Sequence, residues 1–288
     1  MIKSMGIQQK DVIKSRLKKV KVCALDMDGT IYLGRKLFPF TKPFLEGMAQ
    51  VGKKIVFLTN NSSKNAQDYY DKLTNMGLNI EKNQIYTSGD ATIEYLKKLN
   101  PKAKIYLMGT KSLKDDFEAA GFSLVNEKPE FVVLGFDLTF TYKKLHKAAI
   151  FIRNGIPFIA THPDFNCPLE NGEMLPDCGA ISAAFKAATG VTPKIIGKPN
   201  KEMLEGILNR FKIKQDELCI MGDRLMTDIK MGQDLGIFSI LVLTGEAKYR
   251  DLENSNVKPN VIIDRNIDLL KYLDVKNGTL SDRQSKLV

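Results

Sequence analysis

Residues 20–30 read VKVCALDMDGT, a mostly apolar run that leads into two aspartates and a glycine. The run Lys21–Leu25 is short, apolar and followed at once by polar residues, which predicts a buried strand. Asp26 and Asp28 flank a single residue, so both side chains can turn toward one site where the strand ends, and Gly29 permits a tight turn there. The other interpretation of DMDGT alone is a strand that simply ends in an acidic turn.

Short apolar runs alternate with amphipathic stretches along the rest of the chain. This alternation predicts an α/β protein with a mostly parallel sheet. No segment has the composition of a linker, so a second domain would be an insertion. The predicted strands are Lys21–Leu25, Lys54–Leu58, Ala103–Met108, Glu130–Phe136, Pro157–Ala160, Leu218–Met221, Ile237–Leu243 and Asn260–Ile263. The predicted helices are Pro43–Val51, Lys64–Met76, Ala91–Leu99, Tyr142–Arg153, Ala180–Ala188, Lys201–Phe211 and Met226–Leu235.

Polar residues follow three further apolar runs. KIVFL is followed by Thr59 and Asn60, KIIG by Lys198, and LCIMG by Asp223, with Asp228 five residues on. Open α/β sheets bind ligands at the carboxyl ends of their strands. If these segments share one sheet, the crevice collects carboxylates, a hydroxyl, an amide and a lysine, a set that suits a divalent cation and a phosphate.

The chemistry of these residue types supports that interpretation. Mg²⁺ takes hard oxygen ligands, usually one or two carboxylates with water and substrate phosphate, and Asp223 can supply the second carboxylate. A carboxylate can also attack phosphorus, while a second one protonates the leaving oxygen and later activates water. Each residue has a structural alternative: Thr59 in a strand-end turn with Ser62 or Ser63 as helix cap, Lys198 as a surface lysine, and Asp223 and Asp228 as acids at a helix N-terminus.

Four motifs in a fixed order carry a family resemblance. DMDGT, Thr59 in LTNNSS, Lys198 in GKPN and the segment GDRLMTD at 222–228 resemble the motifs of the haloacid dehalogenase (HAD) superfamily of phosphohydrolases. LTNNSS, ATHPDFNCP at 160–168, GKPN and GDRLMTDI together resemble its subclass IIA, the NagD-like and 4-nitrophenylphosphatase group. The resemblance covers about residues 20–273.

The resemblance implies a domain organisation. A Rossmann-like parallel-sheet core comprises residues 20–88 and 192–288, and an α/β cap of the C2 type, residues 89–191, is inserted between the second and third motifs. Residues 1–19 form a basic N-terminal extension outside the family pattern. A homodimer formed through the cap agrees with the resemblance, although no residue of the sequence itself indicates one.

The resemblance also implies roles for the site residues. Asp26 is the nucleophile, and Asp28 is the general acid and base, with its backbone carbonyl on Mg²⁺. Asp26 and Asp223 give carboxylate oxygens to the metal. Thr59 and Asn60 hold the phosphoryl group, and Lys198 balances its charge and orients the nucleophile. Arg224 and Thr227 line the phosphate site. Asp228 is an acid just outside the metal's ligands.

The cap sequence leaves the substrate open. His162, Asp164 and Asn166, or the PDCGA turn at 176–180, are the candidates to face the substrate. Related sequences more often carry Asn at the position of His162. As one of only two histidines in the chain, it is interpreted as a hydrogen-bonded loop residue rather than a catalyst.

The expected function is therefore that of a phosphoric monoester hydrolase. It would use Mg²⁺ and an aspartyl-phosphate intermediate to hydrolyse small phosphate esters of the sugar phosphate, phosphoglycolate or 4-nitrophenyl phosphate type. One alternative is a phosphotransferase or phosphomutase on the same scaffold. Another is a non-catalytic binder of phospho-ligands or nucleic acid that uses the basic leader.

Charge and composition narrow the partners. Residues 1–21 contain seven Lys or Arg and one Asp, so most of the net charge of +10 lies in the leader, interpreted as a solvated extension or helix. The body of the chain is not a nucleic-acid surface by charge. No apolar run approaches the length of a membrane span, and the start of the sequence has no secretory pattern. The four cysteines are scattered and lack the spacing of metal ligands, which fits a cytoplasmic protein.

Overall fold

The computed structural model describes residues 7–169 and 172–275. The chain divides into two compact units, Met1–Val56 with Ile213–Val288 (unit 1) and Phe57–Lys212 (unit 2). The first basic residue of the leader, Lys3, and the tail from residue 276 lie outside the described residues. Within the described ranges, no helix has the length and apolar character needed to cross a membrane.

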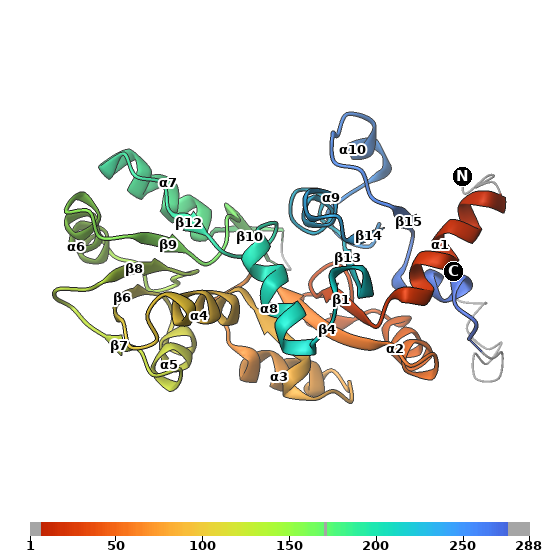
Figure 1. Ribbon diagram of the computed structural model, residues 1–288. Coiled ribbons are helices and arrows are strands. Elements are labelled where there is room, and N and C mark those ends of the chain that lie inside the picture. Colours follow the sequence, from red (N-terminus) through yellow and green to blue (C-terminus); the bar gives the residue numbers. More distant parts are fainter. Residues whose placement is uncertain (1–6, 170–171, 276–288) are drawn as a thin grey trace. The chain divides into compact units, whose positions relative to one another are not determined.

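Unit 1 contains four parallel strands in the order β15-β14-β13-β1 (Figure 1). Nearly all of their side chains are buried, as in parallel sheets covered on both faces. β1 and β13 pair in the register Leu25↔Met221, so the residues that follow these two strands leave the sheet side by side. The bounds are β1 Val22–Asp26, β13 Leu218–Gly222, β14 Phe238–Val242 and β15 Val261–Ile263.

The remaining elements of unit 1 are helices and a small hairpin. A π-helical turn, η3, follows β13 and runs directly into α9. The helices are α1 Ile7–Lys19, α2 Thr41–Gln50, η2 Gln215–Glu217, η3 Leu225–Ile229, α9 Lys230–Leu235, α10 Tyr249–Glu253 and η4 Asn266–Tyr272. The hairpin pairs β2 Tyr32–Leu33 with β3 Lys36–Leu37.

The leader forms a helix, α1, which is one of the two forms expected for it. This helix is docked on unit 1 rather than solvated on all sides, which corrects the other part of the interpretation. Ile13 and Leu17 are 2% and 1% exposed. The ammonium of Lys53 donates to the carbonyls of Leu17 and Val20, at 2.7 Å each. The helix also packs against η4, close to it in Figure 1. Its basic residues lie on the exposed side because one apolar stripe is buried.

Unit 2 contains a five-stranded parallel sheet in the order β12-β9-β8-β6-β7. The bounds are β6 Lys104–Met108, β7 Ser123–Leu124, β8 Phe131–Leu134, β9 Phe158–Ala160 and β12 Lys194–Ile195. A short hairpin, β10 Asn166–Pro168 with β11 Met174–Pro176, follows β9. β4 (Lys54–Thr59) begins in unit 1 and ends in unit 2, where it pairs with β5 (Ile85–Thr87).

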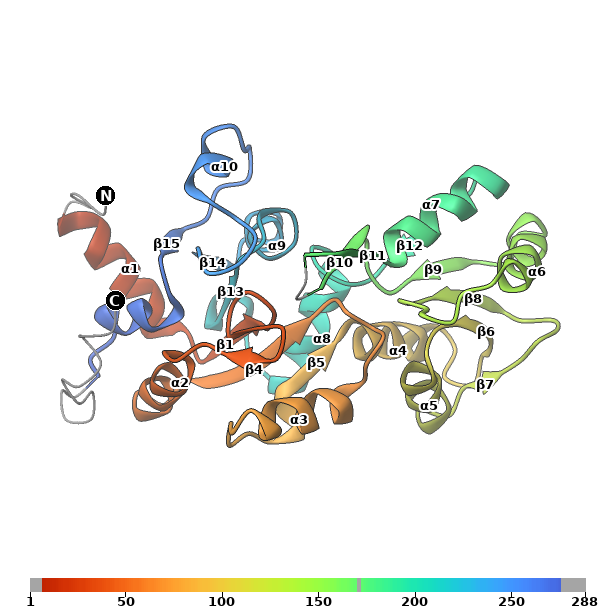
Figure 2. The same ribbon diagram turned by 180° about the vertical axis from the view of Figure 1, so that it is seen from behind.

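Helices cover both faces of the five-stranded sheet. α6 and α7 lie on one face and α4 and α5 on the other (Figure 2). On the face covered by α6 and α7, alternate strand residues such as Tyr106, Val132 and Phe158 form a hydrophobic core with Ala148 and Phe185 of these helices. The helices of unit 2 are α3 Ala66–Asn75, η1 Lys82–Gln84, α4 Ser88–Leu99, α5 Lys111–Ala119, α6 Tyr142–Arg153, α7 Cys178–Thr189 and α8 Lys201–Phe211.

The α/β class with parallel sheets is confirmed, and all eight predicted strands are present within two residues of their predicted ends. The unpredicted strands are two or three residues long, too short for an apolar pattern to reveal them. The π-helical turn was also unforeseen, because Met226–Leu235 has the apolar spacing of an ordinary helix. The predicted boundaries of core and cap stay a prediction.

Candidate active site

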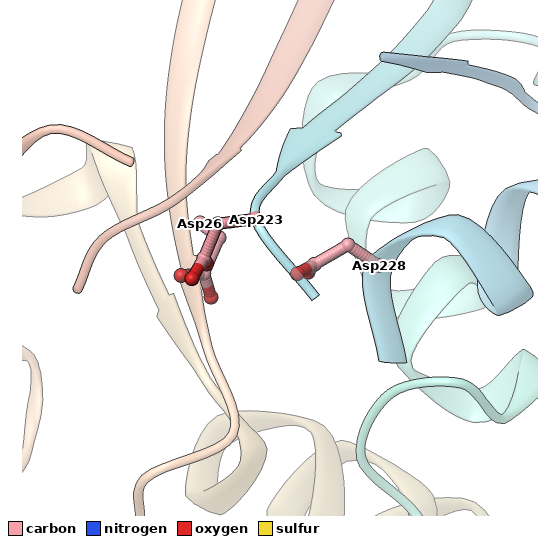
Figure 3. Close-up of side chains that lie close together, drawn as sticks. All are labelled: Asp26, Asp223 and Asp228. Carbon is pink, nitrogen blue, oxygen red and sulfur yellow. The ribbon is translucent and has the colours of Figure 1, made fainter. Parts of the chain in front are cut away.

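Three carboxylates of unit 1 lie together at the carboxyl ends of neighbouring strands (Figure 3). Asp26 ends β1, Asp223 directly follows β13, and Asp228 lies on the π-helical turn η3. One ligand oxygen from each lies within 4.8 Å of the others. Because β1 and β13 are paired and parallel, their polar ends meet, as the sequence predicted for Asp26 and Asp223.

Asp223 is held in a tight and nearly dry position. It is 3% exposed, and its Oδ2 accepts a hydrogen bond from the backbone N–H of Glu246 at 2.7 Å. Its Oδ1 is buried and has no hydrogen-bond partner among the described residues. A Cβ atom at Gly245 or Gly29 would lie 1.9 or 2.4 Å from Oδ2, so both positions need glycine for this close approach.

The electrostatics of Asp223 follow from this burial. Loss of solvent, and then the nearby negative charge of Asp228, raise the pKa of Asp223 to about 7. Crowded buried carboxylates with an unsatisfied oxygen are costly unless a cation balances them. Their oxygen donors are the ligands that divalent cations such as Mg²⁺ prefer. These residues therefore fit a divalent metal ion.

Two further predicted residues surround Asp228. The backbone N–H of Arg224 donates to Oδ2 of Asp228 at 3.3 Å, and the hydroxyl of Thr227 lies 3.5 Å from the same oxygen. The guanidinium of Arg224 pairs with Glu246 at 3.0 Å. Asp228 itself, predicted just outside the metal's ligands, lies within the same 4.8 Å as the other two carboxylates.

Asp28 lies apart from that cluster. It follows β1 by two residues, its side chain is exposed, and its backbone forms a bridge with Tyr32. Its carboxylate is not one of the three grouped oxygens. The turn is closed by the N–H of Gly29, which donates to the carbonyl of Tyr32 at 2.8 Å.

The phosphate-site candidates of unit 2 are also brought together. The backbone N–H of Lys198 donates to Oδ1 of Asn60 at 2.8 Å, and Nδ2 of Asn60 donates to the carbonyl of Lys198 at 3.0 Å. Lys198 is only 2% exposed, so the surface-lysine alternative is wrong. Thr59 ends β4 and accepts from the N–H of Asn61. Neither Ser62 nor Ser63 caps α3; a capping box on Asn65 does.

Sequence reasoning missed two parts of the site. After β14, Gly245 leaves room for the side chain of Asp223, and the N–H of Glu246 donates a hydrogen bond to it. Gly197 allows the backbone before Lys198 to lie close to Asn60. A Cβ at Gly197 would lie 2.6 Å from Oδ1 of Asn60. The available signal was their position, since glycines that follow strands of an open α/β sheet permit close backbone approach.

A parallel α/β fold with carboxylates clustered at its strand ends is typical of enzymes that bind a divalent metal ion and a phosphate group. Two family models match the chain, haloacid dehalogenase-like hydrolase over residues 23–123 and HAD-hydrolase-like over residues 195–269. The chain belongs to this hydrolase family, as the motifs predicted, and is one of its phosphatases. Its α/β core with an inserted cap domain is the architecture predicted from that resemblance.

Three relatives place the chain within the NagD-like group. The acid sugar phosphatase of Staphylococcus aureus is 34% identical over 84% of this chain and 94% of its own length. The 4-nitrophenylphosphatase of Thermotoga maritima is 46% identical, with a TM-score of 0.86 over 89% of this chain and 98% of that one. NagD of Escherichia coli is 31% identical, with a TM-score of 0.81 over 86% and 98%.

Proposed function

We propose that this phosphatase hydrolyses small phosphate esters with Mg²⁺, through a phosphorylated aspartate. The observation that carries the proposal is the group formed by Asp26, Asp223 and Asp228, in which the buried Oδ1 of Asp223 has no hydrogen-bond partner in the part of the chain that the structure describes. The relatives named for sugar phosphate and 4-nitrophenyl phosphate support the substrate class. We therefore propose a sugar phosphate, phosphoglycolate or a similar small monoester as substrate.

In the first proposed step, a carboxylate oxygen of Asp26 attacks phosphorus and the bond from phosphorus to the ester oxygen breaks. Asp28 gives its proton to that leaving oxygen. In the second step Asp28 takes a proton from water, the water oxygen attacks phosphorus, and the bond to Asp26 breaks. The products are the alcohol and inorganic phosphate, and both aspartates return to their starting states.

The other residues of the proposed site hold the metal ion and the phosphoryl group and balance their charges. Asp26 and Asp223, with the backbone carbonyl of Asp28, would hold Mg²⁺, which when bound supplies positive charge against the phosphoryl oxygens. Asn60 and Thr59 would donate hydrogen bonds to the phosphoryl group, and Lys198 would add its charge, an ammonium well suited to phosphate. Arg224 and Thr227 would line the same site, and Asp228 would orient the loop through its bonds to them.

The test is turnover of 4-nitrophenyl phosphate by the full chain with Mg²⁺, with EDTA, and in the variant Asp26→Asn. We expect activity that needs Mg²⁺ and falls by at least about a thousandfold in Asp26→Asn, because the amide is not a nucleophile. Rapid quenching of a turnover with ³²P-labelled ester should trap label on the protein. A panel of sugar, glycolate, nucleotide and pyridoxal phosphates then ranks the substrates.

Three results would contradict the proposal. Activity that is unchanged in EDTA removes the metal role, and an active Asp26→Asn variant removes the nucleophile. Transfer of the phosphoryl group to an added alcohol or sugar in preference to water would favour the phosphotransferase alternative. A folded chain with no turnover on any ester, but with affinity for phosphate esters or nucleic acid, would favour a binding protein. Size-exclusion chromatography of the same preparation tests the predicted homodimer.

A further inference from the structure

A buried histidine of unit 2 is bonded at both ring nitrogens. His162, near the start of the loop after β9, is 0% exposed. Its Nδ1 lies 2.8 Å from the hydroxyl of Thr161, and its Nε2 lies 2.9 Å from Oδ1 of Asp177. The same Asp177 oxygen accepts from the N–H of Cys178 at 2.6 Å, at the start of α7. The interpretation of His162 as a hydrogen-bonded residue is thus confirmed.

The chain of hydrogen bonds continues to the loop that follows β4. The hydroxyls of Thr161 and Ser62 are 2.9 Å apart, and the oxygen of Ser62 accepts from the N–H of Phe136 at 2.9 Å. One arrangement of the hydrogen atoms gives every donor in this chain an acceptor. In that arrangement Ser62 donates to Thr161, Thr161 donates to Nδ1 of His162, and Nε2–H of His162 donates to Asp177.

The order hydroxyl, imidazole, carboxylate is also that of a hydrolytic triad. A nucleophile must meet its substrate, however, and both Thr161 and Ser62 are 0% exposed. Fully buried hydroxyls with satisfied hydrogen bonds hold a structure in one arrangement. This network is therefore not a second active site, and its role lies in what it holds in place.

The network contacts both loops that carry the proposed phosphate ligands. Ser62 lies two residues after Asn60. On the other side, the N–H of Gly197 donates to the carbonyl of Thr161 at 2.7 Å, and a Cβ at Gly197 would lie 3.0 Å from Cβ of His162. Gly197 directly precedes Lys198. The segment Thr161–His162 thus lies against the loops of Asn60 and Lys198 at once.

We propose that Thr161, His162 and Ser62 are positioning residues for phosphate binding. They fix the two loops so that the Asn60–Lys198 pair keeps one geometry, and Asp177 anchors the network to α7. This inference rests on the proposed function, because it assigns Asn60 and Lys198 to phosphate. A displacement of ligands by even 1 Å is enough to cost about a hundredfold in rate.

The test compares Thr161→Val, which removes the hydroxyl at nearly constant volume, with Thr161→Ser, which keeps it. We measure kcat and KM for 4-nitrophenyl phosphate and the inhibition constant of inorganic phosphate, with Mg²⁺, well below the unfolding temperature of each variant. We expect Thr161→Val to raise the inhibition constant at least about fivefold and to lower kcat about tenfold. Thr161→Ser should stay within about twofold of wild type.

The matched control is Tyr86→Phe, which also removes one buried hydroxyl from unit 2, the donor to Glu94 at 2.9 Å. It should lower the unfolding temperature and leave both constants unchanged. Wild-type constants in Thr161→Val, with only a lower unfolding temperature, would overturn the proposal, as would equal losses in the Ser and Val variants. If Thr161→Val does not fold, Ser62→Ala breaks the same link and carries the same expectations.

Failure of the proposed function would be recognised separately. If the wild type hydrolyses no ester, calorimetric titration with inorganic phosphate in the presence of Mg²⁺ replaces kinetics. A Kd that rises at least about fivefold in Thr161→Val supports the positioning role without turnover. A wild type that binds no phosphate, or a Kd equal in wild type and Thr161→Val, overturns it.

Discussion

Asn60 and Lys198 are 138 positions apart in the chain, yet they exchange two hydrogen bonds, side-chain amide to backbone at both atoms. Both residues are almost fully buried. The amide of Asn60 thereby bonds both the N–H and the C=O of Lys198. One side chain thus fixes the backbone that carries the proposed phosphate-binding charge.

Replacement of Asn60 by Ala should cost both stability and activity. It leaves the buried N–H and C=O of Lys198 without these partners, and each such loss costs about 1–3 kcal/mol. We expect the free energy of unfolding to fall by about 2–4 kcal/mol and turnover of 4-nitrophenyl phosphate to fall at least about tenfold. Urea unfolding and initial rates measure the two effects.

Asn100→Ala provides the comparison for that variant. The amide of Asn100 donates to Glu130 at 3.0 Å and accepts from the N–H of Lys102 at 3.1 Å, both on an exposed surface, so its loss should change unfolding by less than about 1 kcal/mol and leave turnover intact. An Asn60→Ala variant with wild-type turnover would show that the backbone of Lys198 needs no such support.

The site was predictable from sequence where a motif falls at a strand end. Asp26 and Asp223 were expected to meet because the strands before them are apolar, buried and parallel, and pairing of β1 with β13 brings them together. Asn60 and Lys198 were both expected to act on the phosphate. Their direct pairing was not predicted, because no local pattern encodes a bond between residues 138 positions apart.

The parts that sequence did not reveal depend on tertiary packing. The leader has a high charge that suggested a solvated segment, but burial of Ile13 and Leu17 outweighs that charge. The π-helical turn that carries Asp228 has the composition of an ordinary helix. Gly245 is one of many glycines, and beyond its place after a strand it is distinguished by packing, because a Cβ atom there would lie 1.9 Å from Oδ2 of Asp223.

Asp223→Asn should have opposite effects on stability with and without metal. In EDTA the variant removes one of three crowded buried carboxylates, so it should unfold at a higher temperature than wild type. With Mg²⁺, wild type should gain stability as binding to the folded state predicts, about 2.7 kcal/mol at a hundred times the Kd, while the variant gains much less. Thermal unfolding in EDTA and in Mg²⁺ measures both differences.

The informative outcome is a reversal in the order of the two unfolding temperatures. Asp234→Asn, on the partly exposed ion pair with Lys230, is the control and should respond to Mg²⁺ as wild type does. Equal stabilisation of wild type and Asp223→Asn by Mg²⁺ would rule out Asp223 as a ligand.

Leu17→Ala tests whether α1 is part of unit 1. Leu17 is 1% exposed, and truncation of a buried leucine costs about 2–5 kcal/mol. Val12→Ala on the same helix removes a side chain that is 61% exposed, and it should cost less than about 0.5 kcal/mol. Urea unfolding of both variants gives the comparison, and deletion of residues 1–19 should destabilise the chain at least as much as Leu17→Ala. A deletion variant as stable as wild type would restore the solvated interpretation.

The carboxyl of Asp116 should make stability depend on pH. Burial, and then the negative charge of Asp90, raise the pKa of Asp116 to about 6, although Asn65 donates to it at 3.1 Å. Because this pKa exceeds the value of about 3.9 in the unfolded chain, the folded state holds the proton more tightly, and the contribution of Asp116 to stability falls as pH rises from about 4 to about 6. Asp116→Asn keeps an oxygen for Asn65 and removes the titration. We expect the variant to gain stability relative to wild type between pH 4.5 and pH 7.5, measured as the difference in urea midpoints.

The neighbouring Asp115→Asn is the control for this pH dependence. It breaks the exposed pair with Lys111 and should show no such gain. A pH-independent difference between Asp116→Asn and wild type would show that Asp116 has no raised pKa.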